Sequence, residues 1–169
     1  ACVSAIEKTM RRNGRTNFTI VQSLVGDSEE MVPFSEGKDV QGASIYTSSE
    51  ASARVHQIRL DDFAPLRALP DASTAVLMVD VEGYEPRVLR GATELIRRLT
   101  PLIVFDYNVI SRRYFSLEEI REIVGDSYSI LRLRKDGVLD GGVGDAWNFV
   151  AVPTGTPFEK VLRCRIVAS

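Results

Sequence analysis

The sequence predicts an α/β domain whose central sheet is mainly parallel and closes with an antiparallel hairpin. Between residues 75 and 105, a buried strand, an amphipathic helix and a second buried strand follow one another, as in the βαβ unit of a parallel sheet. After residue 128, two strand-like segments flank the turn pair Asp136-Gly137, which is typical of a hairpin. The 169 residues, 44% of them hydrophobic, suit one domain with a single sizeable core.

The first predicted element is a helix with one apolar face. Val3, Ile6 and Met10 recur at helical spacing, and Asn13-Gly14 supplies a stop signal. A β-rich run at residues 18–25 follows. In an open α/β sheet such a helix normally comes after a strand that covers its apolar face. We therefore expect a further strand upstream of this helix.

Between the first strand and the βαβ unit, the chain predicts short elements. Residues 28–52 are polar and loop-like, with a short edge strand at residues 31–34. Apolar and polar residues alternate from Arg54 to Leu60, which predicts another short strand. Asp61 and Asp62 then open a brief helical turn that runs to Leu69.

The βαβ unit begins with the continuous apolar run at residues 75–79, as expected for a strand buried on both faces. A helix is predicted from Glu85 to Leu99, with Pro86 in the first turn, where its missing N–H costs nothing. Residues 102–105 form the second buried strand. Two strands joined in this way are expected to be parallel, with a right-handed crossover.

The C-terminal part predicts one helix and two strands. Ser116 and Glu119 have the spacing of a capping box, so we expect a helix that starts at Leu117 and ends near Gly125. Alternation predicts a strand over residues 128–134, and residues 146–152 form the last predicted strand.

Acidic and polar residues follow three of the predicted strands. Asp27 comes after one strand, Asp80 and Glu82 after the next, and Asp106 and Asn108 after a third. Open α/β sheets bind ligands beyond the carboxyl ends of their strands, so these groups are expected around one cleft. An Asp before a turn also commonly caps backbone N–H groups, and for Asp27 both roles stay open. For Asp80 a functional role is favoured, because burying a carboxylate without a partner is costly.

Three segments of the chain resemble the signature of the FkbM family of S-adenosylmethionine-dependent methyltransferases. The segments are L-D-D-F at residues 60–63, V-D-V-E-G-Y-E at residues 79–85 and V-L-R-G-A at residues 88–92. Residues 25–27 and 148–153 also fall where the family has similar stretches. The similarity covers nearly the whole chain, and the two central motifs at this offset are its specific part.

The resemblance implies a Rossmann-like class I methyltransferase sheet, of which residues 1–169 form a single, partial domain. The family's first strand-helix-strand portion, with its glycine-rich cofactor loop, is not among these residues, and we expect it upstream of Ala1. One further departure concerns a lysine that the family usually has two residues before the signature aspartate. Apolar Met78-Val79 stand there in this chain.

The resemblance also implies roles for individual residues. S-adenosylmethionine is the expected cofactor, bound by Gly26, Asp27 and Asp80, with Asp27 near the adenine and Asp80 near the methyl donor. Asp80 or Glu82 is the candidate catalytic base for the acceptor hydroxyl.

The acceptor is expected to be a hydroxyl group of a small molecule or a sugar. Tyr84, Glu85 and Asn108 are the candidate acceptor-binding residues, although Glu85 could instead hold the loop. Residues 28–52 and 107–115 are the expected acceptor loops.

Two other functions stay open at this point. A degenerate methyltransferase fold would act as a structural or partner-binding subunit. The pair Asp80 and Glu82 also resembles the acidic pairs that hold a divalent cation in metal-dependent glycosyltransferases, although no metal-binding residue is assigned here.

Charge and hydropathy narrow the expected partners. The 21 Lys and Arg residues against 23 Asp and Glu residues give a net charge of −2, which offers no electrostatic case for nucleic acid. The sequence contains neither the apolar run of a membrane span nor the apolar core of a signal peptide, so we expect a soluble, cytoplasmic protein.

Overall fold

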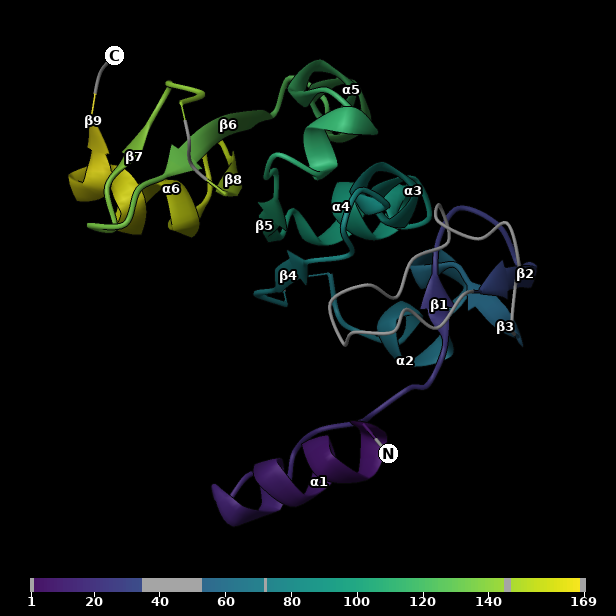
Figure 1. The fold of residues 1–169 in the computed structure, drawn as a ribbon. Helices are drawn as coiled ribbons and strands as arrows, with labels where there is room; N and C mark the ends of the chain where they lie inside the picture. The colour runs from purple at the N-terminus through teal and green to yellow at the C-terminus, as the bar shows by residue number, and fades with distance from the viewer. Residues whose placement is uncertain (1, 35–52, 72, 145–146, 168–169) are drawn as a thin grey trace.

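The computed structural model describes residues 2–34, 53–71, 73–144 and 147–167, and the strands within these ranges form two sheets (Figure 1). The smaller sheet has the strand order β1-β3-β2, and the larger has the order β4-β5-β8-β6-β7-β9. Helix α1 (Cys2–Arg12) confirms the first predicted helix and lies apart from both sheets. No helix in the described ranges has the length and apolar character that a bilayer crossing requires.

The smaller sheet contains three short strands from the N-terminal part. β1 (Leu24–Val25) runs parallel to β3 (Ala53–Ile58), and β2 (Glu30–Phe34) runs antiparallel to β3, which confirms the predicted short strands there. Only the last two residues of the predicted strand 18–25 pair, because β-propensity forms a strand only where a neighbouring strand accepts its hydrogen bonds. Residues 35–52 of the predicted loop lie outside the described residues.

The predicted βαβ unit is present at one end of the larger sheet. β4 (Val76–Val79) and β5 (Leu102–Asp106) pair in parallel, as expected. The helix between them is not continuous, so the predicted helix 85–99 is wrong at its middle. It consists of α3 (Glu85–Arg90) and α4 (Thr93–Leu99), separated by two residues.

The break between α3 and α4 has a packing cause. A Cβ placed on Gly91 would lie 1.9 Å from the backbone oxygen of Gly26, so only glycine fits at this position without a shift of the backbone. The new helix start is capped from another segment. The carboxylate of Asp61 accepts hydrogen bonds from the backbone N–H groups of Glu94, at 3.1 Å, and Leu95, at 2.9 Å. Asp61 belongs to η1 (Leu60–Asp62), which with α2 (Ala64–Arg67) forms the predicted helical turn.

The C-terminal part of the chain contributes helices to both faces of the larger sheet. The predicted helix forms as α5 (Leu117–Val124), and the Ser116 hydroxyl accepts the backbone N–H of Glu119 as its cap. The Glu119 carboxylate does not complete the capping box, because it pairs with Arg90 on α3 at 2.6 Å. Near the C-terminal end are α6 (Pro157–Leu162) and η3 (Arg163–Arg165).

The C-terminal strands make the larger sheet mixed rather than mainly parallel. β8 (Asn148–Pro153) lies between β5 and β6 (Tyr128–Leu133) and is antiparallel to both. β7 (Leu139–Asp140) is antiparallel to β6 and parallel to β9 (Ile166–Val167). β7 follows β6 through a short hairpin, and such a connection reverses the strand, whereas a parallel pair needs a long crossover. The predicted antiparallel pairing of residues 128–134 with residues 146–152 is confirmed as β6 with β8. The turn at Asp136-Gly137, however, leads into β7, which was not predicted, and the parallel character is largely limited to β4 and β5.

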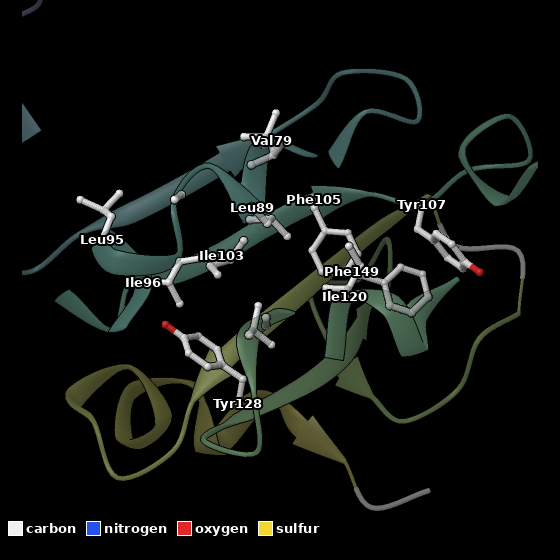
Figure 2. Close-up of a cluster of buried hydrophobic side chains, with 14 of the residues drawn as sticks. Val79, Leu89, Leu95, Ile96, Ile103, Phe105, Tyr107, Ile120, Tyr128 and Phe149 are labelled. Atoms are coloured by element: carbon white, nitrogen blue, oxygen red, sulfur yellow. The ribbon is translucent and has the colours of Figure 1, made fainter. Parts of the chain in front are cut away.

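The main core lies on the face of the larger sheet that α3, α4 and α5 cover (Figure 2). Apolar side chains from these helices meet those of β5 and β8, among them Leu89, Ile96, Ile103, Ile120 and Phe149. A smaller cluster on β7 and β8 packs against residues of α6 and β9 on the other face. β4 is the first strand of the sheet, and its Val76 and Met78 are 61% and 70% exposed.

Candidate functional site

Carboxylates gather where β4 and β5 end. Val79 lies opposite Phe105 in the parallel register, so the next residues along each strand, Asp80 and Asp106, are neighbours at the carboxyl edge of the sheet. Asp80 is exposed, whereas Asp106 is only 7% exposed. Burial raises the pKa of Asp106, a hydrogen bond from Ser111 opposes this, and the charges of Asp80 and Glu82 raise it further. Asp80, Glu82 and Asp106 are thus grouped as predicted, whereas Asp27, which was expected around the same cleft, pairs with Arg87 instead.

Asn108 organises this group of acids. Its Nδ2 donates to Asp106 Oδ2 at 2.6 Å and to Glu82 Oε2 at 3.4 Å. Its Oδ1 accepts the backbone N–H groups of Ile110, at 2.6 Å, and Ser111, at 3.1 Å. The Ser111 hydroxyl donates to Asp106 Oδ2 at 3.0 Å. An amide has two donor hydrogens and two acceptor positions, so these four contacts occupy Asn108 in positioning the carboxylates.

Glu85 lies beneath the loop at residues 80–83, here called the acidic loop, and holds its shape. Its side chain has no exposed surface. Oε1 accepts the backbone N–H of Val81 at 3.1 Å, and Oε2 accepts that of Gly83 at 2.8 Å. Between these two donors, Glu82 has a φ of 52°, a left-handed conformation that a non-glycine residue keeps only when its surroundings enforce it. Of the two predicted roles for Glu85, the geometry supports loop support.

The burial of Glu85 predicts a pH-dependent stability. Burial raises the pKa of this carboxyl from its ordinary value of 4.5 to about 7, against the effect of its backbone hydrogen bonds. The folded state therefore binds the proton more tightly than the unfolded state. The stability that this gives is full below pH 4.5 and is lost as the pH rises to about 7. Such a shift corresponds to about 3 kcal/mol.

Glu85→Gln removes this titration, so the variant should lose less unfolding free energy than the wild type between pH 4.5 and 7. Urea unfolding at a series of pH values measures the difference, with exposed Glu122→Gln as the matched control. Parallel curves for wild type and Glu85→Gln would show that Glu85 is ionised in the folded protein throughout this range.

Tyr84 connects the acidic loop to the smaller sheet. It is 5% exposed, and its hydroxyl donates to Gln57 Oε1 at 2.7 Å. Gln57 has no exposed surface, and its Nε2 donates to Ser28 Oγ at 2.8 Å and to the Ser28 backbone oxygen at 3.0 Å. Gly26 is packed against the same side chain, since a Cβ there would lie 2.4 Å from the Gln57 amide carbon. Gln57 was not predicted as a site residue, because its place in an alternating strand carries no signal of burial.

Asp27 lies in a second charged cluster beside this network. Its Oδ1 is 3.3 Å from Nη1 of Arg87, and its side chain is 29% exposed. The Arg87 guanidinium carbon lies 5.4 Å from the centre of the Tyr84 ring. The Asp27–Arg87 pair therefore packs against the ring of Tyr84. The assignment of Asp27 to the adenine remains a prediction.

Most of the chain matches a known protein family. The family model described as the methyltransferase FkbM domain matches residues 9–133. The chain belongs to the FkbM methyltransferase family. Among solved structures, the chain is similar to the methyltransferase FkbM from Methylobacillus flagellatus KT, with a TM-score of 0.56 and 19% identity. The match covers 88% of this chain and 33% of that one, so it supports the fold over a third of the longer protein's length. No curated protein matches the chain significantly.

The three signature segments of this FkbM domain meet in the structure. The backbone N–H of Asp61, in the first segment, donates to the Gly91 oxygen in the third at 2.9 Å. Gly91 packs on Gly26, and Arg90 beside it pairs with Glu119. In the middle segment, Glu85 supports the loop that carries the acids. Many of the signature residues therefore have a structural role, since they position the loop that carries the acidic residues.

Proposed function

We propose that this FkbM domain transfers the methyl group of S-adenosylmethionine to a hydroxyl oxygen of its acceptor, with Asp80 at the reacting centre. The position of Asp80 is the observation that supports this most directly. It is exposed, it directly follows β4, and Asp106 is its neighbour across the sheet. Ligands of open α/β sheets bind at this edge of the strands.

The residues at this edge suit the charge of the proposed cofactor. S-adenosylmethionine carries a sulfonium and an ammonium group, and Asp80, Glu82 and Asp106 concentrate negative charge where such cations would be attracted. Of the two predicted residues after β1, Gly26 is buried against Gln57, whereas Asp27 retains an accessible carboxylate for the adenosine portion. When bound, the cofactor supplies an electrophilic methyl group.

The chain's own residues would contribute alignment and a base. Methyl transfer is an in-line displacement in which the acceptor oxygen bonds to the methyl carbon as the sulfur–carbon bond breaks. Holding the reactants in line is the larger contribution. Asp80 would take the hydroxyl proton, because it is exposed, whereas Asp106 is only 7% exposed and its Oδ2 already accepts two hydrogen bonds. Glu82, held by Asn108, would line the acceptor side.

Calorimetry with S-adenosylmethionine on the complete protein tests the proposal. We expect saturable heat for the wild type and a lower affinity for the cofactor in Asp80→Ala, since this variant lacks a carboxylate that faces the cofactor's positive charge. Glu122→Gln, an exposed acid on α5, should bind as the wild type does and controls for a general loss of negative charge. Absence of heat at millimolar cofactor would contradict the proposal and favour a degenerate, non-catalytic fold.

A further inference from the structure

We infer that the acceptor carries its hydroxyl on an apolar body, aliphatic or aromatic, and that an apolar collar around the acidic residues binds this body. This inference rests on the proposed function, because it assigns the collar to the methyl acceptor. The collar consists of five exposed apolar side chains on three loops, which are Val81, Val109, Ile110, Tyr114 and Trp147.

Hydrogen bonds and close packing place these loops of the collar beside the acids. Val81 stands between Asp80 and Glu82. The backbone N–H of Ile110 donates to Asn108, the residue that holds Glu82. The ring of Tyr114 covers Gly83, where a Cβ would lie 2.5 Å from a ring carbon. The collar therefore adjoins the site rather than a remote surface.

The loop that carries Trp147 joins the others through two hydrogen bonds. The backbone N–H of Tyr107 donates to the Trp147 oxygen at 2.7 Å. Arg112 stacks on the Tyr107 ring at 5.1 Å and donates to the Gly144 oxygen at 2.8 Å. Trp147 is thus fixed next to the loop that contains Val109 and Ile110, which is the acceptor loop predicted at residues 107–115.

The exposure of the collar distinguishes between the two acceptor classes that the sequence left open. Val109 is 68% exposed, Trp147 67%, Ile110 48% and Tyr114 42%, and exposed apolar groups gathered in this way mark a binding surface. A free sugar would need a polar partner for each buried hydroxyl, since an unpaired one is costly. The Asn108 amide is already fully engaged. An acceptor with one hydroxyl beside an apolar body leaves fewer polar groups unpaired.

Binding without cofactor tests this inference through the fluorescence of Trp147, the chain's single tryptophan. Hexyl β-glucoside, below its micelle concentration, and methyl β-glucoside share one polar head group and differ only in apolar length. Hexyl β-glucoside should shift the emission to shorter wavelength and half-saturate at a concentration about tenfold or more below that of methyl β-glucoside. Trp147→Phe gives the baseline for emission from any other source.

Two matched variants separate the collar from other apolar surface. Ile110→Ser should raise the half-saturating concentration about tenfold. Val161→Ser, at an exposed apolar residue on α6, should leave it unchanged. Far-UV circular dichroism checks that both variants fold. Equal responses to the two glucosides, or equal effects of the two variants, would overturn the inference.

The same reagents distinguish failure of the inference from failure of the proposed function. Methyl transfer to glucosides without any Trp147 response would overturn the collar and leave the proposed function standing. A Trp147 response in a protein that gives no calorimetric heat with millimolar S-adenosylmethionine would overturn the proposed function and leave the collar as a binding surface.

Discussion

Asp80→Asn is expected to lower kcat for methyl transfer by about a hundredfold or more, the usual contribution of a positioned base. Asparagine matches aspartate in shape but cannot take the acceptor's proton. Asp80 is exposed on the rim, so the change should leave the fold and the KM for the acceptor close to those of the wild type. Initial rates at saturating cofactor measure the effect, and thermal unfolding verifies the fold.

The control for this variant is Asp126→Asn, which removes an equal charge from an exposed loop after α5. It should retain full activity. A kcat for Asp80→Asn within about threefold of the wild type would contradict the role of Asp80 as base, since a lost base costs about a hundredfold. Glu82→Gln would then be the variant to compare, because Glu82 is the other acid on the same loop.

Gly91→Ala is expected to lower the free energy of unfolding by about 3 kcal/mol and the melting temperature by about 10 °C. Backbone conformation does not cause this effect. Gly91 has φ −73° and ψ −1°, close to the φ −77° and ψ −8° that Ala68 adopts at the end of α2. The cause is the Gly26 backbone oxygen, 1.9 Å from where the new Cβ would lie. Thermal and urea unfolding measure the loss.

Gly137→Ala supplies the opposite case as a control. Gly137 has a φ of 78°, which disfavours alanine, but no atom lies within 4 Å of its Cβ position. Its replacement should cost about 1 kcal/mol, the strain of one left-handed residue. Equal losses in the two variants would show that α3 and α4 can move away from Gly26 at little cost.

The part of the site that lies directly after strands could be predicted from the sequence. The apolar runs of β4 and β5 are continuous, and two parallel strands joined by a helix must end at the same edge. The proximity of Asp80 and Asp106 followed from that alone. The helix break at Gly91 could not be predicted in this way, because its cause is a backbone contact with Gly26, 65 positions away in the sequence.

Buried polar groups were the other feature that pattern alone could not reveal. Glu85 opens a helix, where an acidic residue is ordinarily exposed, and only the folded loop shows that its two oxygens accept the N–H groups of Val81 and Gly83. Gln57 is buried because Tyr84 and Ser28, from two other segments, supply its hydrogen bonds. The sheet direction was missed for a related reason, since no local signal places β8 between β5 and β6.

The bare side of β4 restricts what could extend the larger sheet. β5 is the one strand in the described ranges that pairs with β4, and Val76 and Met78 point to the same uncovered face. A strand added on that side would complete the row of backbone hydrogen bonds. It would also need to bring an apolar element that shields these two side chains from water. The same added segment would therefore have to supply both the backbone pairing and the apolar cover.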